Sequence, residues 1–100
     1  MSSNMDKLKV DFPELYDTAA KLNDTVYSGR VLSQKEQKII AIALAAGSCN
    51  EVATRKQMEN AIKYYDVNKD EIMDALGIVL IMNGKPAFTK AVGVLYSLLE

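Results

Sequence analysis

The pattern of hydrophobic and polar positions predicts a chain made of helices. After Pro13, apolar side chains at Leu15, Ala19 and Leu22 recur every three or four residues, which is the period of an amphipathic helix. Proline is well tolerated in a first helical turn, and glycine commonly ends a helix in a left-handed conformation. We therefore expect a first helix from Pro13 to just before Gly29.

The longest apolar run, Ile39 to Ala46, predicts the centre of the fold. Ser33 and Glu36 precede it with the S-x-x-E spacing of a capping box, so a second helix is expected over Ser33 to Ala46. The run carries no polar side chain on any face. A helix of this kind needs neighbours all round, which indicates a central helix.

Two further helix starts follow the same logic. Ser48 and Glu51 have capping-box spacing directly after Gly47, so a third helix is expected from about Cys49 to Tyr65, with Cys49 in its first turn. Its polar side chains then form a solvated face.

A fourth helix is expected after the cap formed by Asn68 and Glu71. Its second half, Gly77 to Met82, could also be a buried strand, because short apolar runs are ambiguous. We favour a helix, since a lone strand would have no partner in this chain. Asn83-Gly84 ends it, and Lys85-Pro86 opens a fifth helix.

These elements predict an all-α fold of about five helices in a single domain over residues 1–100, with residues 1–10 polar enough to fray. The second helix, the end of the fourth and a wide stripe on the fifth are more apolar surface than one small subunit can cover. We therefore expect an obligate homo-oligomer, a ring or paired rings. Irregular packing that covers every face is the alternative.

Composition excludes several classes of protein. Twelve Lys and Arg balance 13 Asp and Glu without a basic cluster, so nucleic acid is not an expected partner. No histidine is present, and a lone cysteine allows neither an internal disulfide nor C-x-x-C spacing. We expect no metal and no cofactor. No apolar stretch reaches the roughly 18 residues of a membrane span, and no signal-peptide segment is present, which predicts a soluble, cytoplasmic protein.

Cys49 is the one candidate nucleophile. The positive end of a helix stabilises a thiolate, whereas the nearby Glu51 opposes that effect, and a lone cysteine is often buried and inert. Lys38 would lower the thiol pKa if it faced the same turn. A lysine on an apolar helix more often extends its ammonium to water, and this is our expectation for Lys38. Glu36 and Glu51 are the other possible neighbours.

Two weaker patterns allow alternative interpretations. Glu36, Glu51, Glu59 and Glu71 could pair across subunits as metal ligands, but no E-x-x-H spacing supports this, and helix caps explain all but Glu59. Tyrosines 64, 65 and 96 could line a ligand site or an interface, although aromatic residues at helical spacing usually belong to a core.

Several motifs in order resemble the carboxymuconolactone decarboxylase-like family, which includes alkyl hydroperoxidase D. They are Leu32-Ser33 with Lys35-Glu36 before the apolar helix, Asp70-Glu71-Ile72, and Asn83-Gly84-Lys85-Pro86-Ala87-Phe88. The similarity covers about residues 32–91. It implies an alkyl hydroperoxidase D-like all-α domain that assembles as a trimer, a hexamer or a related ring.

The residues that would carry the family's chemistry are replaced. The resemblance implies a relay of a Glu on the central helix, a C-x-x-C pair and a His, and an ungapped alignment puts Lys38, Asn50, Ala53 and Gln57 at these positions. A slip of one residue would restore only Cys49. The decarboxylase branch also relies on a His that this chain lacks.

Two hypotheses follow for the function. The first is a catalytically degenerate family member, an oligomeric scaffold or a binding protein for a small ligand. The second is a one-cysteine thiol peroxidase or reductase, with peroxiredoxin-type activity at Cys49.

Overall fold

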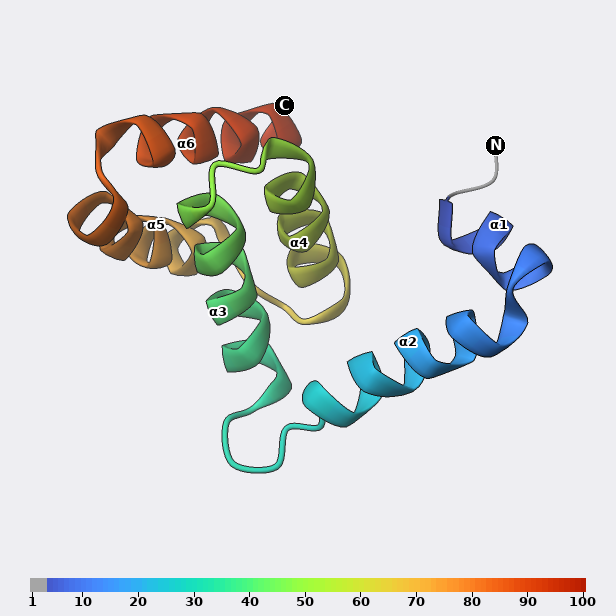
Figure 1. Cartoon of the computed structure of the whole chain (residues 1–100). Helices are drawn as coiled ribbons and strands as arrows, with labels where there is room; N and C mark the ends of the chain where they lie inside the picture. Colours follow the sequence, from blue (N-terminus) through green and yellow to red (C-terminus); the bar gives the residue numbers. More distant parts are fainter. Residues whose placement is uncertain (1–3) are drawn as a thin grey trace.

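The computed structural model describes residues 4–100, and every element in that range is a helix. These helices are labelled in Figure 1. In chain order they are α1 (Asn4–Asp11), α2 (Pro13–Val26), α3 (Gln34–Gly47), α4 (Glu51–Tyr64), α5 (Lys69–Asn83) and α6 (Lys85–Leu99). The all-α prediction is confirmed, and the segment from Gly77 to Met82 is helical within α5.

The extra helix is α1, so the described residues hold one helix more than the roughly five expected; the fraying of residues 1–10 stays a prediction. Residues 1–3 lie outside the described range. Asp6 in the first turn and Lys9 in the last turn of α1 match the helix dipole. The helix ends before Phe12, whose backbone is non-helical (φ −137°, ψ 69°), since the following Pro13 disfavours the helical region for the residue before it. The polar composition of this segment therefore gave no sign of a short helix whose charges are favourably placed at its two ends.

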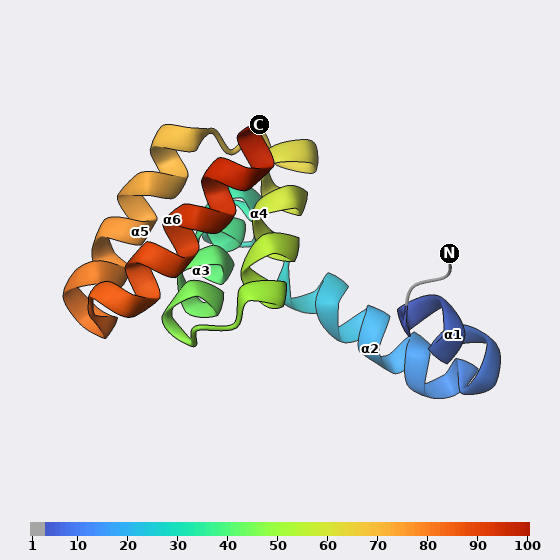
Figure 2. The ribbon, with the colours of Figure 1, turned by 90° about the horizontal axis from the view of Figure 1, so that it is seen from above.

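Helices α3 to α6 form a compact body around one core. Figures 1 and 2 show α3 lying among α4, α5 and α6. Side chains with no exposed surface come from all four helices: Ile42, Met58, Ala61, Ile72, Leu76 and Leu95. Burying one such large side chain contributes about 1.5–3 kcal/mol, so these contacts hold the body together.

The covering of α3 is incomplete within one chain. Ile42 and Ala46 are buried, whereas Ile40 and Leu44 are 46% and 71% exposed. The predicted central helix thus has neighbours on one side and an open apolar strip on the other.

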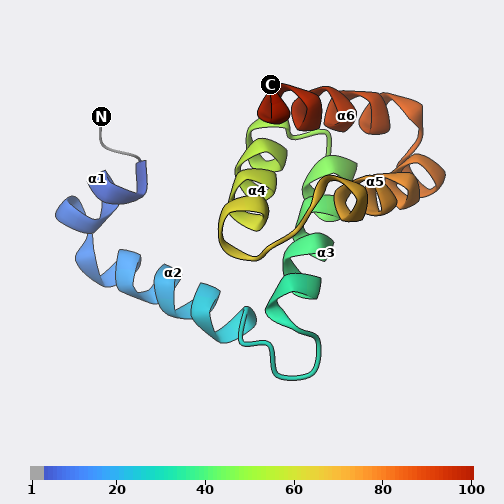
Figure 3. The same ribbon diagram turned by 180° about the vertical axis from the view of Figure 1, so that it is seen from behind.

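Helices α1 and α2 form an arm that extends away from the body (Figures 1 and 3). The apolar stripe predicted for α2 is present, but Leu15, Leu22 and Val26 are all more than half exposed, and no residue of either helix is buried. The radius of gyration, 14.6 Å, exceeds the roughly 13 Å expected for a compact domain of this length. The apolar side chains of the arm are therefore not buried in a core within this chain.

A polar joint sets the direction of the arm. The Gln34 side chain donates to the carbonyl of Tyr27 (2.6 Å), and the Gln37 side chain donates to the carbonyl of Val26 (2.7 Å). Gln37 also accepts from the amide of Gly29 (3.1 Å), which has the left-handed φ (+67°) expected of a terminator. Two glutamines of α3 therefore hold the last turn of α2 in place.

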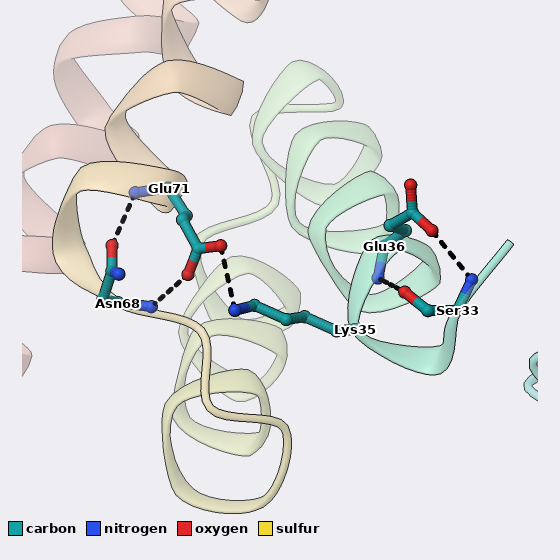
Figure 4. A network of polar contacts seen from close by, with 5 residues as sticks. All are labelled: Ser33, Lys35, Glu36, Asn68 and Glu71. Carbon is teal, nitrogen blue, oxygen red and sulfur yellow. Dashed lines mark hydrogen bonds and ion pairs between the residues drawn. The ribbon is translucent and has the colours of Figure 1, made fainter.

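Two capping boxes fix the starts of α3 and α5, as Figure 4 shows. Ser33 and Glu36 exchange hydrogen bonds of 2.9 and 3.0 Å, and Asn68 and Glu71 do the same at 3.0 and 2.9 Å. These bonds to the ionised form lower the pKa of both carboxyl groups. Glu71 also pairs with Lys35 (3.0 Å), which links the two helix starts.

Replacement of Ser33 by Ala removes the hydroxyl that accepts from the Glu36 amide. We expect Ser33→Ala to lower the free energy of unfolding by about 1 kcal/mol, the usual cost of a lost N-cap. Urea denaturation followed by circular dichroism measures the change. Ser28→Ala, an exposed serine in the preceding loop, is the matched control, and an equal loss in both variants would contradict the capping role.

Candidate functional site

Cys49 lies in the turn between α3 and α4, outside either helix. Its thiol is free and exposed, its amide donates to the carbonyl of Ala46 (3.0 Å), and its φ is +60°. This left-handed conformation closes the end of α3, a place usually taken by Gly or Asn. The prediction that Cys49 stands in the first turn of the next helix is wrong.

The cap of α4 explains the difference. Asn50, one residue after Cys49, is the N-cap, and its side chain accepts from the amide of Ala53 (3.0 Å). The Ser48 hydroxyl instead donates back to the carbonyl of Ala45 (2.7 Å), so the predicted capping box of Ser48 and Glu51 does not form. Asn is at least as good an N-cap as Ser. Because Asn50 and not Ser48 caps the helix, α4 begins two residues later than predicted.

Lys38 is a mostly buried residue whose ammonium lies against two tyrosine rings. The residue as a whole is 5% exposed, and its Nζ lies 3.7 Å from the ring centre of Tyr27 and 5.1 Å from that of Tyr65. Both distances suit a cation–π contact. Three elements therefore meet here: the end of α2, the first turns of α3 and the end of α4.

The sequence held a signal for this burial. Lys38 stands four and eight residues before Ile42 and Ala46, so it shares the helix face that enters the core. Tyr27 and Tyr65 were not linked to it because both follow the last turn of their own helices, where a helical period no longer applies.

Lys38 and Cys49 are not brought together. Gly47 lies nine positions after Lys38 on α3, which corresponds to about 14 Å along the helix axis. Lys38 also faces the tyrosines at the start of α3, whereas Cys49 follows its end. Lys38 therefore cannot act on the thiol as a neighbouring charge.

The residues at the other three replaced relay positions, Asn50, Ala53 and Gln57, are not brought together into one site. Asn50 caps α4, and Ala53 is a half-buried residue of its first turn. Gln57 is partly buried, and its Oε1 is excluded from solvent without a hydrogen bond partner among the described residues. No thiol pair and no acid–base pair results from these side chains.

The four glutamates considered as metal ligands across subunits do not lie together within one chain. Glu36 and Glu71 are engaged in capping boxes, while Glu51 and Glu59 are exposed on α4. Across residues 4–100, no group of three or more His, Cys, Asp and Glu side chains could hold a metal ion. In the same range, every helix is too short or too polar to cross a bilayer.

Of the tyrosines singled out in the sequence, only Tyr65 joins the Lys38 site. Tyr64 and Tyr96 are 66% and 50% exposed.

Burial lowers the pKa of Lys38, because desolvation disfavours the charged ammonium. The unfolded chain then binds a proton more readily than the folded protein, so folding gains stability as pH rises through the lowered pKa towards about 10.4. We expect the wild type to gain stability relative to Lys38→Met over this range. Urea titrations between pH 7 and 10.5 test this, and a constant difference would contradict it.

Comparison with known proteins places the chain in a family. The sequence model of the carboxymuconolactone decarboxylase family matches residues 13–96. Two relatives come from Methanocaldococcus jannaschii. The uncharacterized protein MJ0742 is 49% identical, over 94% of this chain and 90% of its own length. The uncharacterized protein MJ1511 is 31% identical, over 91% and 84%. With its helical fold and a family match over most of its length, this chain belongs to the carboxymuconolactone decarboxylase family.

Proposed function

We propose that this chain is a catalytically degenerate member of its family, an oligomeric helical scaffold or a binding protein for a small ligand. The observation that carries the proposal is the position of Lys38. The residue aligned with the family's proton-accepting Glu is a lysine held between two tyrosine rings. A carboxylate relay cannot operate through an ammonium.

The geometry around Cys49 supports the same conclusion. A thiol peroxidase needs a thiolate stabilised by a positive environment and a group that takes up or supplies protons. Cys49 stands at the end of α3, next to the acidic first turn of α4, and within residues 4–100 no hydrogen bond to its sulfur is found. The one-cysteine peroxidase is the alternative, and it rests on exposure of the thiol alone.

Assembly with copies of the same chain is the second part of the proposal. Isolated helices shorter than about 12–15 residues are marginal in water, yet α1 and α2 have 8 and 14 residues and bury nothing. The polar joint holds the arm away from the body of its own chain. We infer that the apolar stripe of the arm is covered by another chain.

Each body offers a surface that such an arm could cover. Ile78, Ile81 and Met82 on α5 are 64–84% exposed, and a groove of about 330 Å³ between α3 and α5 adjoins Ile78. Apolar patches of this kind mark contacts with other chains. We propose that arms and bodies exchange between copies, in a trimer or a hexamer.

Loss of enzyme chemistry predicts no hydroperoxide turnover. We expect consumption of cumene hydroperoxide in the presence of dithiothreitol to equal the rate without protein, and Cys49→Ser to leave that rate unchanged. Peroxide loss is followed colorimetrically. Turnover that disappears in Cys49→Ser would establish the thiol peroxidase instead.

Assembly through the arm predicts that a charge on its apolar stripe separates the subunits. A buried unpaired charge costs about 3 kcal/mol or more, so Leu22→Glu should weaken association by roughly a hundredfold. Sedimentation velocity at micromolar concentration measures the mass. Lys21→Glu, on the polar side of the same helix, is the control and should stay assembled. A wild type that sediments as single chains would refute the assembly.

A further inference from the structure

Gly77 leaves a hollow in the exposed side of α5. It stands in the middle of the helix, and a Cβ added there would have open space around it, with no atom of another element within 4 Å. A glycine inside a helix lowers the folding equilibrium constant about fivefold relative to alanine. No contact within residues 4–100 therefore accounts for the missing side chain at this position.

Apolar side chains surround the hollow. Asp74, Ile78 and Ile81 form with Gly77 the four-residue hole that a helix offers to a side chain of its neighbour, and all four residues are exposed. Asp74 and Ile78 also line the groove of about 330 Å³ between α3 and α5. The hollow is thus continuous with an apolar groove.

Gly93 on α6 gives a comparison within the same chain. An added Cβ would meet no atom within 4 Å there either. The residues one turn before and after it are mostly polar: Thr89, Lys90, Tyr96 and Ser97. An apolar partner would take their hydroxyl and ammonium groups out of water, which is unfavourable. Of these two glycines, only Gly77 lies in an apolar face.

Leu22 is the side chain of the arm that fits such a hollow. It is the most exposed large apolar side chain of α2. Three of the four residues one turn away from it are small: Thr18, Ala19 and Thr25. Leu22 therefore projects from the helix as a knob, and a hole enlarged by a glycine has room for a leucine.

The charges beside the two positions are complementary. Lys21 precedes Leu22 on the arm, and Asp74 is one corner of the hole. No ion pair within residues 4–100 involves either Lys21 or Asp74. An exposed pair contributes little to affinity, whereas like charges at this place would oppose the contact. The two charges therefore favour this alignment, and a change at Lys21 alone should leave the subunits assembled.

The two positions do not meet within one chain. Figures 1 and 2 show α3 between α5 and the arm, so Leu22 and Gly77 lie on opposite sides of that helix. The hydrogen bonds of Gln34 and Gln37 to the last turn of α2 hold the arm in this direction. A contact between Leu22 and Gly77 therefore joins two copies of the chain.

We propose that Leu22 of one copy packs into the hollow at Gly77 of another copy, with Lys21 beside Asp74. The inference rests on the assembly half of the proposed function and names the residues at the contact. Interhelical distances depend on the side chains at the point of contact, and a glycine there lets the leucine approach the backbone of α5. A side chain at position 77 would occupy the space that the leucine fills.

The first test fills the hollow. We expect Gly77→Ala to weaken association at least about fivefold, because an extra methyl group in a packed contact forces the helices apart. Sedimentation velocity over a dilution series measures the dissociation constant, and circular dichroism checks that the helix content is kept.

Gly93→Ala is the control for this test. It makes the same change at the open glycine of α6, and it should leave association unchanged. Equal dissociation constants for the wild type and Gly77→Ala, or an equal weakening by Gly93→Ala, would overturn the proposal.

The second test asks whether Leu22 is the side chain in the hollow. Leu22→Ala alone should also weaken association, since it leaves the hollow empty. Combined with Gly77→Ala, it should give association at least about fivefold tighter than the two separate losses multiplied together, because the added methyl group then lies in the vacated space. Losses that simply multiply would overturn the pairing and would show that another element covers Gly77.

These outcomes separate the contact from assembly itself. A wild type that sediments as single chains would refute both the proposed assembly and this contact. A wild type that stays assembled, together with a Gly77→Ala variant that associates equally well, would overturn only the contact.

Discussion

The packing of α3 against three other helices is the contact on which the rest of the structure depends. Ile42 is fully excluded from water, and side chains from α4, α5 and α6 meet around it. Because the same helix is apolar on its opposite side, the fold that buries Ile42 must leave Leu44 exposed. One subunit can satisfy the inner half of α3 and not the outer half.

Much of this fold could be predicted from local sequence. The boxes at Ser33 and Asn68, the terminator Gly29 and the helix opening at Lys85-Pro86 were read correctly, because each depends on residues a few positions apart. The start of α4 was misread because two capping residues, Ser48 and Asn50, compete within three positions, and local spacing alone does not choose between them.

The site was predictable only in part. The family resemblance gave the positions of the missing relay. It did not give the burial of Lys38, because this burial requires Tyr27 and Tyr65 to come from elements far apart in sequence. The position of Cys49 in the turn after α3 could not be predicted either, because its left-handed backbone depends on how α3 ends. In both cases the decisive contact is tertiary, and a helical period carries no information about it.

The polar joint of Gln34 and Gln37 has a consequence for how subunits would be arranged. If arms reach between copies, the angle at which each arm leaves its body is the angle by which one subunit is rotated from the next. Two side-chain amides and one glycine would then encode the rotational symmetry of the assembly. Relatives with a longer or shorter connection at residues 27–33 could close with a different number of members, while their helical cores stayed the same.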